Sequence, residues 1–184
     1  MSNLAKSTRQ LLIENFHLPR LTRVAEQVSK DGSRKYLLGL HDGKTIETVL
    51  MPHHDHHTVC VSSQVGCAMG CSFCVTGKMG LIRNLSAGEI VEQVVEARRD
   101  ATGLPLRNIV FMGMGEPFHN YDQVMTALEI LTDEYGFNFS QRRITVSTSG
   151  LVPQIRRFGQ ERVKANLAIS LNGSSDTVRG RLMP

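Results

Sequence analysis

The sequence predicts an α/β fold: a partial (βα) barrel with a short helix and a β-hairpin in front of it. Two observations lead to this prediction. Short apolar or β-branched runs alternate with helix-compatible segments in the second part of the chain, as is typical of parallel βα units. An Asp-Gly turn between two alternating strands precedes them. Four βα strands are too few to close a barrel, which takes about eight, so we expect it to be incomplete.

Residues 1–52 are expected to form an N-terminal extension. Leucine and phenylalanine recur among polar residues between positions 4 and 16, a loosely amphipathic pattern that predicts a helix. Residues 35–40 and 45–50 read as strands and flank Asp42-Gly43, a pair that favours a tight antiparallel turn. We therefore expect residues 1–52 to carry a helix and a β-hairpin in front of the barrel.

Residues 53–184 are expected to form the incomplete barrel. The capping-box pattern from Ser86 to Glu89 opens its first helix. An unpaired parallel edge is an aggregation hazard, so we expect either a longer protein or a partner that covers this edge. The predicted strands span 58–63, 108–112, 144–147 and 166–171, and the predicted helices span 86–100, 121–134, 153–158 and 174–181.

Composition and charge narrow the class of protein. With 41% hydrophobic and 21% charged residues, the chain has the composition of a globular domain. It contains no run of about 18 apolar residues and no apolar N-terminal leader, so we expect a cytoplasmic protein without a membrane anchor. A net charge of +4 and a pI near 9.0 would help a polyanion to approach, but they do not by themselves assign a nucleic-acid ligand.

All four cysteines fall within residues 60–74. In a reducing compartment, clustered cysteines are more typical of metal or redox sites than of disulfides. Cys67, Cys71 and Cys74 follow a predicted strand with the spacing C-x3-C-x2-C. Three thiolates so close in sequence suit a soft metal centre.

Two kinds of metal centre remain open at this point. An iron–sulfur cluster held by three cysteines leaves one iron free for a substrate or cofactor. A zinc ion would take a fourth ligand, either Cys60 or a histidine of the run at positions 53–57. We expect that histidine run to be an exposed linker, and we rank metal binding as its second interpretation. Gly66 and Gly70 permit the backbone turns that either centre needs.

The cysteine spacing, with Phe73 directly before the third cysteine, resembles the signature of the radical S-adenosylmethionine (SAM) enzymes. More closely, the chain resembles the RlmN family of adenine-C2 methyltransferases that act on 23S rRNA and tRNA. Four segments carry this resemblance in order: CVSSQVGCAMGCSFC, FMGMGEP, RRITVSTSG and LAISLN. It runs from about Gly32 to Pro184 and implies a barrel of the radical SAM type.

The resemblance implies a 4Fe-4S cluster and SAM as cofactors. Cys67, Cys71 and Cys74 would ligate the cluster, and its open iron would bind the amino and carboxylate groups of SAM before electron transfer cleaves SAM to a 5′-deoxyadenosyl radical. The remaining SAM contacts would come from the cysteine loop and from the predicted strand ends: Phe73, Gly115, Glu116, Ser147, Ser170, Leu171 and Asn172. Asn172 departs from the family pattern, because well-known members have histidine there.

The resemblance also implies roles for Glu47 and Cys60 in the RNA chemistry. Ordinary SN2 methyl donation from SAM cannot reach the C2 carbon of adenine. The family therefore first methylates a cysteine near its C-terminal end and adds that methyl carbon to the ring by radical chemistry. Cys60 would then attack the sulfur of the methylated cysteine to form a disulfide, which leaves the methyl group on RNA. Glu47 would accept the C2 proton.

The methyl-carrying cysteine has no counterpart among the 184 residues, so we expect the chain to be truncated at both ends and to be inactive alone in methylation. Two alternatives remain. One is a C8-specific rRNA adenine methyltransferase, a group that usually has alanine where this chain has Pro117. The other is a zinc-stabilised RNA-binding fragment. Expected partners are RNA (23S rRNA and tRNA) and an electron donor such as flavodoxin, with no membrane; the sequence leaves the oligomeric state open.

Overall fold

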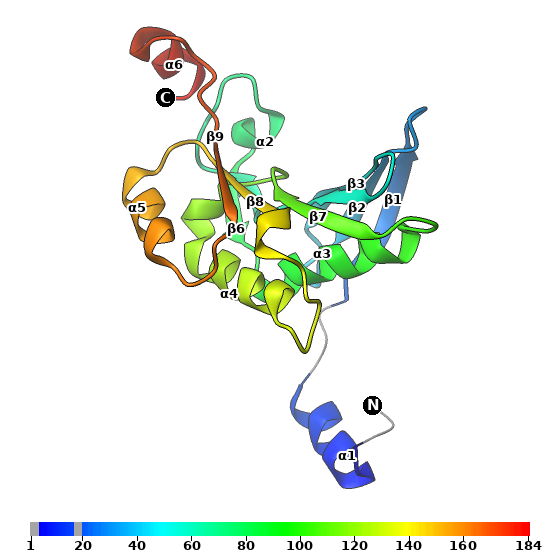
Figure 1. The fold of residues 1–184 in the computed structure, drawn as a ribbon. Coiled ribbons are helices and arrows are strands. Elements are labelled where there is room, and N and C mark those ends of the chain that lie inside the picture. The colour runs from blue at the N-terminus through cyan, green and yellow to red at the C-terminus, as the bar shows by residue number, and fades with distance from the viewer. Residues whose placement is uncertain (1–3, 17–19) are drawn as a thin grey trace.

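The computed structural model describes residues 4–16 and 20–184, whose arrangement Figure 1 shows. A mixed seven-stranded sheet has the strand order β1-β2-β3-β4-β7-β8-β9, and a two-stranded sheet pairs β5 with β6. The α/β class and the incomplete barrel predicted from the sequence are confirmed. No helix among these described residues is long and apolar enough to span a membrane.

The antiparallel part of the large sheet comes from the N-terminal residues. β1 (Thr22–Val28), β2 (Arg34–Gly39) and β3 (Thr45–Pro52) pair in sequence order, and β3 then pairs antiparallel with β4 (His57–Cys60). The predicted hairpin is therefore present, and its turn places Gly43 in the left-handed region with φ +77°. Strands from residues 1–52 and 53–184 share one sheet, and the division of the chain into two domains stays a prediction.

The parallel part of the sheet carries the barrel. β4, β7, β8 and β9 run parallel to one another, as the alternation of strand and helix patterns predicts. Each of these strands overlaps a predicted one. The bounds are β7 (Leu106–Phe111), β8 (Ile144–Thr148), β9 (Asn166–Ile169), α3 (Ala87–Asp100), α4 (Tyr121–Thr132), α5 (Val152–Gln160) and α6 (Asp176–Leu182).

One face of the sheet packs against helices. α3 begins at the predicted capping box, where Ser86 Oγ accepts from the Glu89 N–H at 3.2 Å and the Glu89 carboxylate accepts from the Ser86 N–H at 2.9 Å. Thr48 Oγ1 on β3 donates to Gln93 Oε1 on α3 at 2.8 Å, and both side chains are buried. The apolar core therefore lies between this face and the helices.

The opposite face of the sheet is less covered. Along β3, positions 46, 48 and 50 are buried and the positions between them are half-exposed. β8 alternates in the same way. Because side chains alternate across a strand, the half-exposed set lines the interior of the incomplete barrel.

A small hairpin stands apart from the large sheet. β5 (Gln64–Cys67) pairs with β6 (Gly80–Asn84), and the loop between them contains α2 (Val75–Lys78). The sequence did not predict this hairpin, nor β1, whose side chains are mostly exposed. The remaining elements are α1 (Lys6–Asn15), which buries none of its residues, and the short 3-10 turns η1 (Pro117–Asn120) and η2 (Gln141–Arg143).

The prediction of an exposed histidine linker is only partly correct. His53 and His54 are exposed, but His57 begins β4 and is 8% exposed. The His56 ring stacks on His53 with centroids 4.7 Å apart, and His56 Nδ1 lies 2.6 Å from an Asp55 carboxylate oxygen. The run is ordered because β4 starts within it and pairs back onto β3.

Candidate active site

A cavity of ≈ 310 Å³ opens at the carboxyl ends of the parallel strands. Its walls come from the cysteine loop, from the segment after β7, and from the ends of β8 and β9. Three predicted residues do not line it: Glu47, Cys60 and Leu171. The predicted residues that line it together are Cys67, Cys71, Phe73, Cys74, Gly115, Glu116, Ser147, Ser170 and Asn172.

Cys67, Cys71 and Cys74 contribute thiols to this one cavity, and all three are free of disulfide bonds. Cys67 ends β5, and Cys71 and Cys74 lie in the loop before α2, where the Cys74 N–H donates to the Cys71 carbonyl at 3.0 Å. Burial raises the pKa of Cys67 above its ordinary value, and the nearby Glu116, Cys71 and Cys74 raise it further. The thiols thus share one electrostatic environment.

The donor set fits a cluster better than a single ion. Within residues 4–16 and 20–184, no group of three His, Cys, Asp or Glu side chains is arranged to hold one metal ion. A zinc ion at about 2.3 Å from each sulfur would need its thiolates close together. A 4Fe-4S cluster places each thiolate on a separate iron, so its ligands stand further apart around one cavity. Three soft sulfur donors around one opening match the cluster.

The backbone of the cysteine loop depends on glycine. Gly66 has φ +76°, and a Cβ there would lie 1.9 Å from the Gly80 carbonyl oxygen across the hairpin. This close approach closes the base of the loop, where Cys67 pairs with Gly80. Gly70, with φ +63°, turns the chain between the first two cysteines. Both glycines adopt the left-handed conformation that other residues rarely adopt.

The segment after β7 is fixed to the cysteine hairpin through Gln64. Gln64 Oε1 accepts from the Glu116 N–H at 2.8 Å, and Gln64 Nε2 donates to Asn84 Oδ1 at 2.7 Å. Gly115 has φ +100°, and a Cβ there would lie 2.5 Å from the Gln64 Cβ. Gln64 was not among the predicted site residues, because it follows Ser62 and Ser63 in a polar run and nothing in the sequence sets it apart.

Glu116 is 4% exposed and binds the backbone of η1 and of the residue that follows β8. Its Oε1 accepts from the Phe118 N–H at 3.0 Å and its Oε2 accepts from the Ser149 N–H at 2.8 Å. Hydrogen bonds to an ionised carboxylate are about twice as strong as neutral ones. Glu116 therefore ties the segment that follows β7 to the end of β8 beside the cavity.

Polar groups line the ends of β8 and β9. Ser147 Oγ and Ser170 Oγ lie 3.4 Å apart. Asn172 adopts φ +53° and donates from Nδ2 to Met183 Sδ at 3.2 Å. The Leu171 side chain is 64% exposed and does not line the cavity. Its backbone carbonyl accepts a hydrogen bond from Arg179 at 2.8 Å.

Ser149 is a cavity residue that the sequence analysis missed. It lines the cavity, and its buried Oγ has no hydrogen-bond partner among the residues that the structure describes. A buried polar atom without a partner costs about 1–3 kcal/mol. The orphaned hydroxyl therefore fits a cavity whose ligand supplies the missing hydrogen bond. The only signal in the sequence was its place as the last of three consecutive hydroxyl residues, Ser147 to Ser149.

Glu47 and Cys60 share the half-exposed face of the sheet. Val49 pairs with Cys60 across β3 and β4, and Glu47 lies two positions before Val49, so both side chains belong to this face. Glu47 forms an ion pair with Lys35 at 3.0 Å. Neither residue lines the cysteine cavity, although Met112, which does, donates its backbone N–H to Cys60.

The Cys60 thiol is expected to react slowly. Burial raises the pKa of Cys60, and the hydrogen bond from Met112 offsets this only in part. Because the thiolate is the nucleophile, less of it forms at a given pH in the folded chain than in the unfolded one. At pH 8 we expect iodoacetamide to alkylate Cys60 more slowly in the folded chain than in urea, as measured by peptide mass spectrometry. Equal rates in the two states would contradict this environment.

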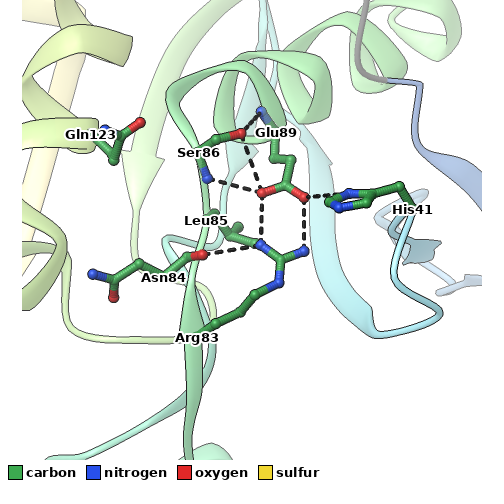
Figure 2. Close-up of a pocket in the computed structure, with 7 residues that line it drawn as sticks. All are labelled: His41, Arg83, Asn84, Leu85, Ser86, Glu89 and Gln123. Carbon is green, nitrogen blue, oxygen red and sulfur yellow. Dashed lines mark hydrogen bonds and ion pairs between the residues drawn. The ribbon is translucent and has the colours of Figure 1, made fainter.

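A second cavity, of ≈ 420 Å³, lies beside the start of α3. Figure 2 shows its charged groups already paired: the Glu89 carboxylate accepts from Arg83 at 2.8 and 2.9 Å and lies 3.5 Å from His41 Nδ1. Arg83 also donates to Asp42 at 2.7 Å. These contacts tie the hairpin turn and β6 to α3, so this cavity has a structural role.

A measurement of the Asp42 pKa tests the contact between Asp42 and Arg83. The hydrogen bond from Arg83 lowers that pKa from 3.8 to about 2. A lowered pKa in the folded state stabilises the fold above the unfolded pKa of about 3.9, and this contribution is lost as pH falls toward 2. In Arg83→Met we expect the Asp42 pKa to return toward its ordinary value, measured by carboxyl carbon NMR. A value that stays near 2 in the variant would count against the assigned contact.

The chain is similar to several known proteins. The model of the radical SAM superfamily matches residues 61–183. The dual-specificity RNA methyltransferase RlmN of Geobacter sulfurreducens is 52% identical over 184 residues, covering 100% of this chain and 50% of that protein. A probable dual-specificity RNA methyltransferase RlmN of Staphylococcus saprophyticus is 50% identical over 186 residues, covering 100% of this chain and 51% of that protein.

A solved structure is also similar. The crystal structure of a radical SAM methyltransferase from Sphaerobacter thermophilus superposes with a TM-score of 0.93 at 53% identity, covering 100% of this chain and 55% of that one. The chain thus spans about half the length of the relatives that it matches.

Proposed function

The chain belongs to the radical SAM superfamily, and from this premise we propose that it carries the SAM-cleaving part of an RNA methyltransferase. The proposed product is adenosine methylated at C2 in 23S rRNA and tRNA. The observation that carries the proposal is the cavity that three cysteines share with the ends of the parallel strands. Membership of the superfamily implies a 4Fe-4S cluster and SAM as cofactors.

Cys67, Cys71 and Cys74 would hold the cluster, which leaves one iron without a protein ligand. When bound, the cluster supplies the electron that cleaves SAM reductively. The hairpin beneath the cysteines is fixed by Gly66 and by the bonds of Gln64. A fixed loop keeps the three thiols aimed at the same opening, as a preorganised site requires.

SAM would lie against the ends of the parallel strands. Ligands of α/β folds bind at the carboxyl edge of the sheet, and the proposed contact residues converge there. Backbone groups of Gly115 and Glu116 would meet the polar end of SAM, and Phe73 would pack on its adenine. Ser147, Ser170, Leu171 and Asn172 would supply polar and backbone contacts from β8 and β9.

Cys60 and Glu47 would act on the RNA adduct rather than on SAM. Their position outside the cavity, on the inner face of the sheet, supports this separation of roles. Cys60 would attack the sulfur that joins the methyl-carrying cysteine to the RNA adduct, so that a disulfide forms as the bond between that sulfur and the added carbon breaks. The carbon stays on RNA with the electron pair and takes up a proton, and Glu47 would accept the proton from adenine C2. With three of the chain's four cysteines assigned to the cluster and Cys60 to resolution, methyl transfer needs a thiol from outside these 184 residues.

The proposed partners follow from this chemistry. RNA is the substrate, and a pI near 9.0 favours its approach. The target adenine would have to leave its base stack to reach a recessed site. A one-electron donor such as flavodoxin would reduce the cluster, and the proposed compartment is the cytoplasm, where thiols and the cluster stay reduced.

The experiment for this function uses the anaerobically reconstituted chain with SAM and dithionite. We expect 5′-deoxyadenosine to form, measured by liquid chromatography and mass spectrometry. Addition of a cysteine-containing C-terminal portion of a relative is expected to yield 2-methyladenosine in an rRNA or tRNA fragment. Absence of 5′-deoxyadenosine from cluster-loaded chain would refute the proposed cofactor chemistry, and 8-methyladenosine would favour the C8-specific alternative.

A further inference from the structure

We propose that Ser149 is a further SAM-binding residue and that Arg179 on α6 is a positioning residue that acts through Ser149 and through the end of β9. This inference rests on the proposed function. Ser149 follows β8 directly and lines the cavity that the three cysteines share. Its Oγ is buried, and no group among residues 4–16 and 20–184 pairs with it. A polar ligand in the cavity would complete its hydrogen bonding after rotation about the Cα–Cβ bond.

The backbone of Ser149 is held from both sides. Its N–H donates to the Glu116 carboxylate at 2.8 Å. Its carbonyl accepts a hydrogen bond from Arg179 Nη2. Both partners are charged side chains, whose hydrogen bonds are the stronger kind. The position of Ser149 at the cavity wall is therefore set by two residues from other segments.

Arg179 also fixes the neighbouring strand end. Its Nη1 donates to the carbonyls of Ser170 and Leu171, each at 2.8 Å. The planar guanidinium presents several donors in a fixed fork, so one side chain can bridge the ends of two strands. Lysine carries the same charge without that fork. Arg179 thus ties β8 to β9 at the point where both reach the cavity.

α6 is placed for this task by its connection to β9 and by the cysteine loop. A Cβ on Gly173 would lie 2.7 Å from the Arg179 backbone nitrogen, so only glycine permits the helix to fold back this closely. At the other end of α6, the Leu182 carbonyl accepts from the Ser72 N–H at 2.8 Å. Figure 1 shows α6 beside the loop that carries α2. The helix therefore spans the strand ends and the cysteine loop.

The test compares SAM affinity in anaerobically reconstituted chain. SAM is titrated into the reduced chain while the electron paramagnetic resonance spectrum of the cluster is followed, and thermal stability is measured by circular dichroism. Ser149→Ala is expected to weaken SAM binding about fivefold, as loss of one neutral hydrogen bond predicts. Its thermal stability should stay equal or rise, because the variant removes an orphaned buried hydroxyl. A purely structural role of Ser149 would lower stability instead.

Arg179→Gln is expected to weaken SAM binding about tenfold, equivalent to ~1.4 kcal/mol. If Arg179 acts through Ser149, the double variant should bind SAM no more than twofold worse than Arg179→Gln alone. Arg179→Lys should fall between wild type and Arg179→Gln. Arg181→Gln is the matched control, since Arg181 lies on the same helix and its side chain makes no hydrogen bond or ion pair with any described residue.

Each outcome decides the proposal. Wild-type affinity in Ser149→Ala overturns the binding role of its hydroxyl. If the loss of SAM affinity in the double variant equals the product of the two single losses, the positioning role of Arg179 is overturned. The same holds if Arg181→Gln loses as much SAM affinity as Arg179→Gln. If Arg179→Gln does not fold, Arg179→Lys takes its place, and wild-type affinity there overturns the positioning role. A cluster-loaded wild-type chain that does not bind SAM overturns the proposed function itself, whereas SAM binding with unaffected variants overturns this inference alone.

Discussion

Replacing Cys71 by serine will remove the cluster from this chain. Cys71 is one of three cysteines that line a single cavity and that we propose as cluster ligands, and no further cysteine lines that cavity to replace it. Serine is a hard oxygen donor that suits iron–sulfur clusters poorly. After anaerobic reconstitution we expect bound iron to fall from about four atoms per chain to a small fraction of one. Formation of 5′-deoxyadenosine should fall about 100-fold or more.

Cys60→Ser is the matched control for this experiment. Cys60 is also a cysteine of this short segment, but it lies outside the cavity on β4. We expect this variant to keep wild-type iron and sulfide content and to cleave SAM normally. Loss of iron from Cys60→Ser to the same extent as from Cys71→Ser would mean that Cys60 is a metal ligand, as the zinc alternative requires.

Replacing Gly66 by alanine will open the hairpin that carries the cysteines. A Cβ at this position would lie 1.9 Å from the Gly80 carbonyl oxygen, which is backbone and cannot rotate away. The left-handed φ of +76° adds strain. Strain and overpacking each cost about 1–3 kcal/mol, so we expect a loss of roughly 4 kcal/mol and a drop in Tm of roughly 10 °C. Thermal circular dichroism measures the change, and iron retention should fall with it.

Gly43→Ala separates the clash from the backbone strain. Gly43 has nearly the same dihedral angle, φ +77°, but no atom lies within 4 Å of its would-be Cβ. This variant should therefore lose only about 1 kcal/mol and keep its iron. Similar destabilisation by the two substitutions would show that the close contact across the hairpin does not hold.

The sequence predicted the parts of the fold that local chemistry specifies. The Ser86 capping box opens α3 where expected, and the Asp42-Gly43 pair marks the turn between β2 and β3. The parallel strands were found because apolar runs alternate with helical patterns. Nine of the predicted site residues, from Cys67 to Asn172, line one cavity, as the cysteine spacing, the strand-end positions and the family resemblance together implied.

The features that escaped prediction depend on contacts between distant segments. β5 and β6 are four and five residues long and pair across the whole cysteine loop, so no local turn signal announces them. β1 is mostly exposed and lacks the apolar alternation of a half-buried strand. Gln64, Ser149 and Arg179 gain their roles only through backbone groups that the fold brings near. Glu47 and Cys60 were placed by resemblance, and their roles stay predictions.

The central claim is that three cysteines hold one iron–sulfur cube with an open corner. Its most direct measurement is the iron, zinc and acid-labile sulfide content of anaerobically reconstituted chain, together with the electron paramagnetic resonance spectrum of the reduced form with and without SAM. The account predicts about four irons and about four sulfides per chain, and a spectrum that changes when SAM is added. One zinc per chain with no sulfide, or a cluster spectrum that SAM leaves unchanged, would contradict it.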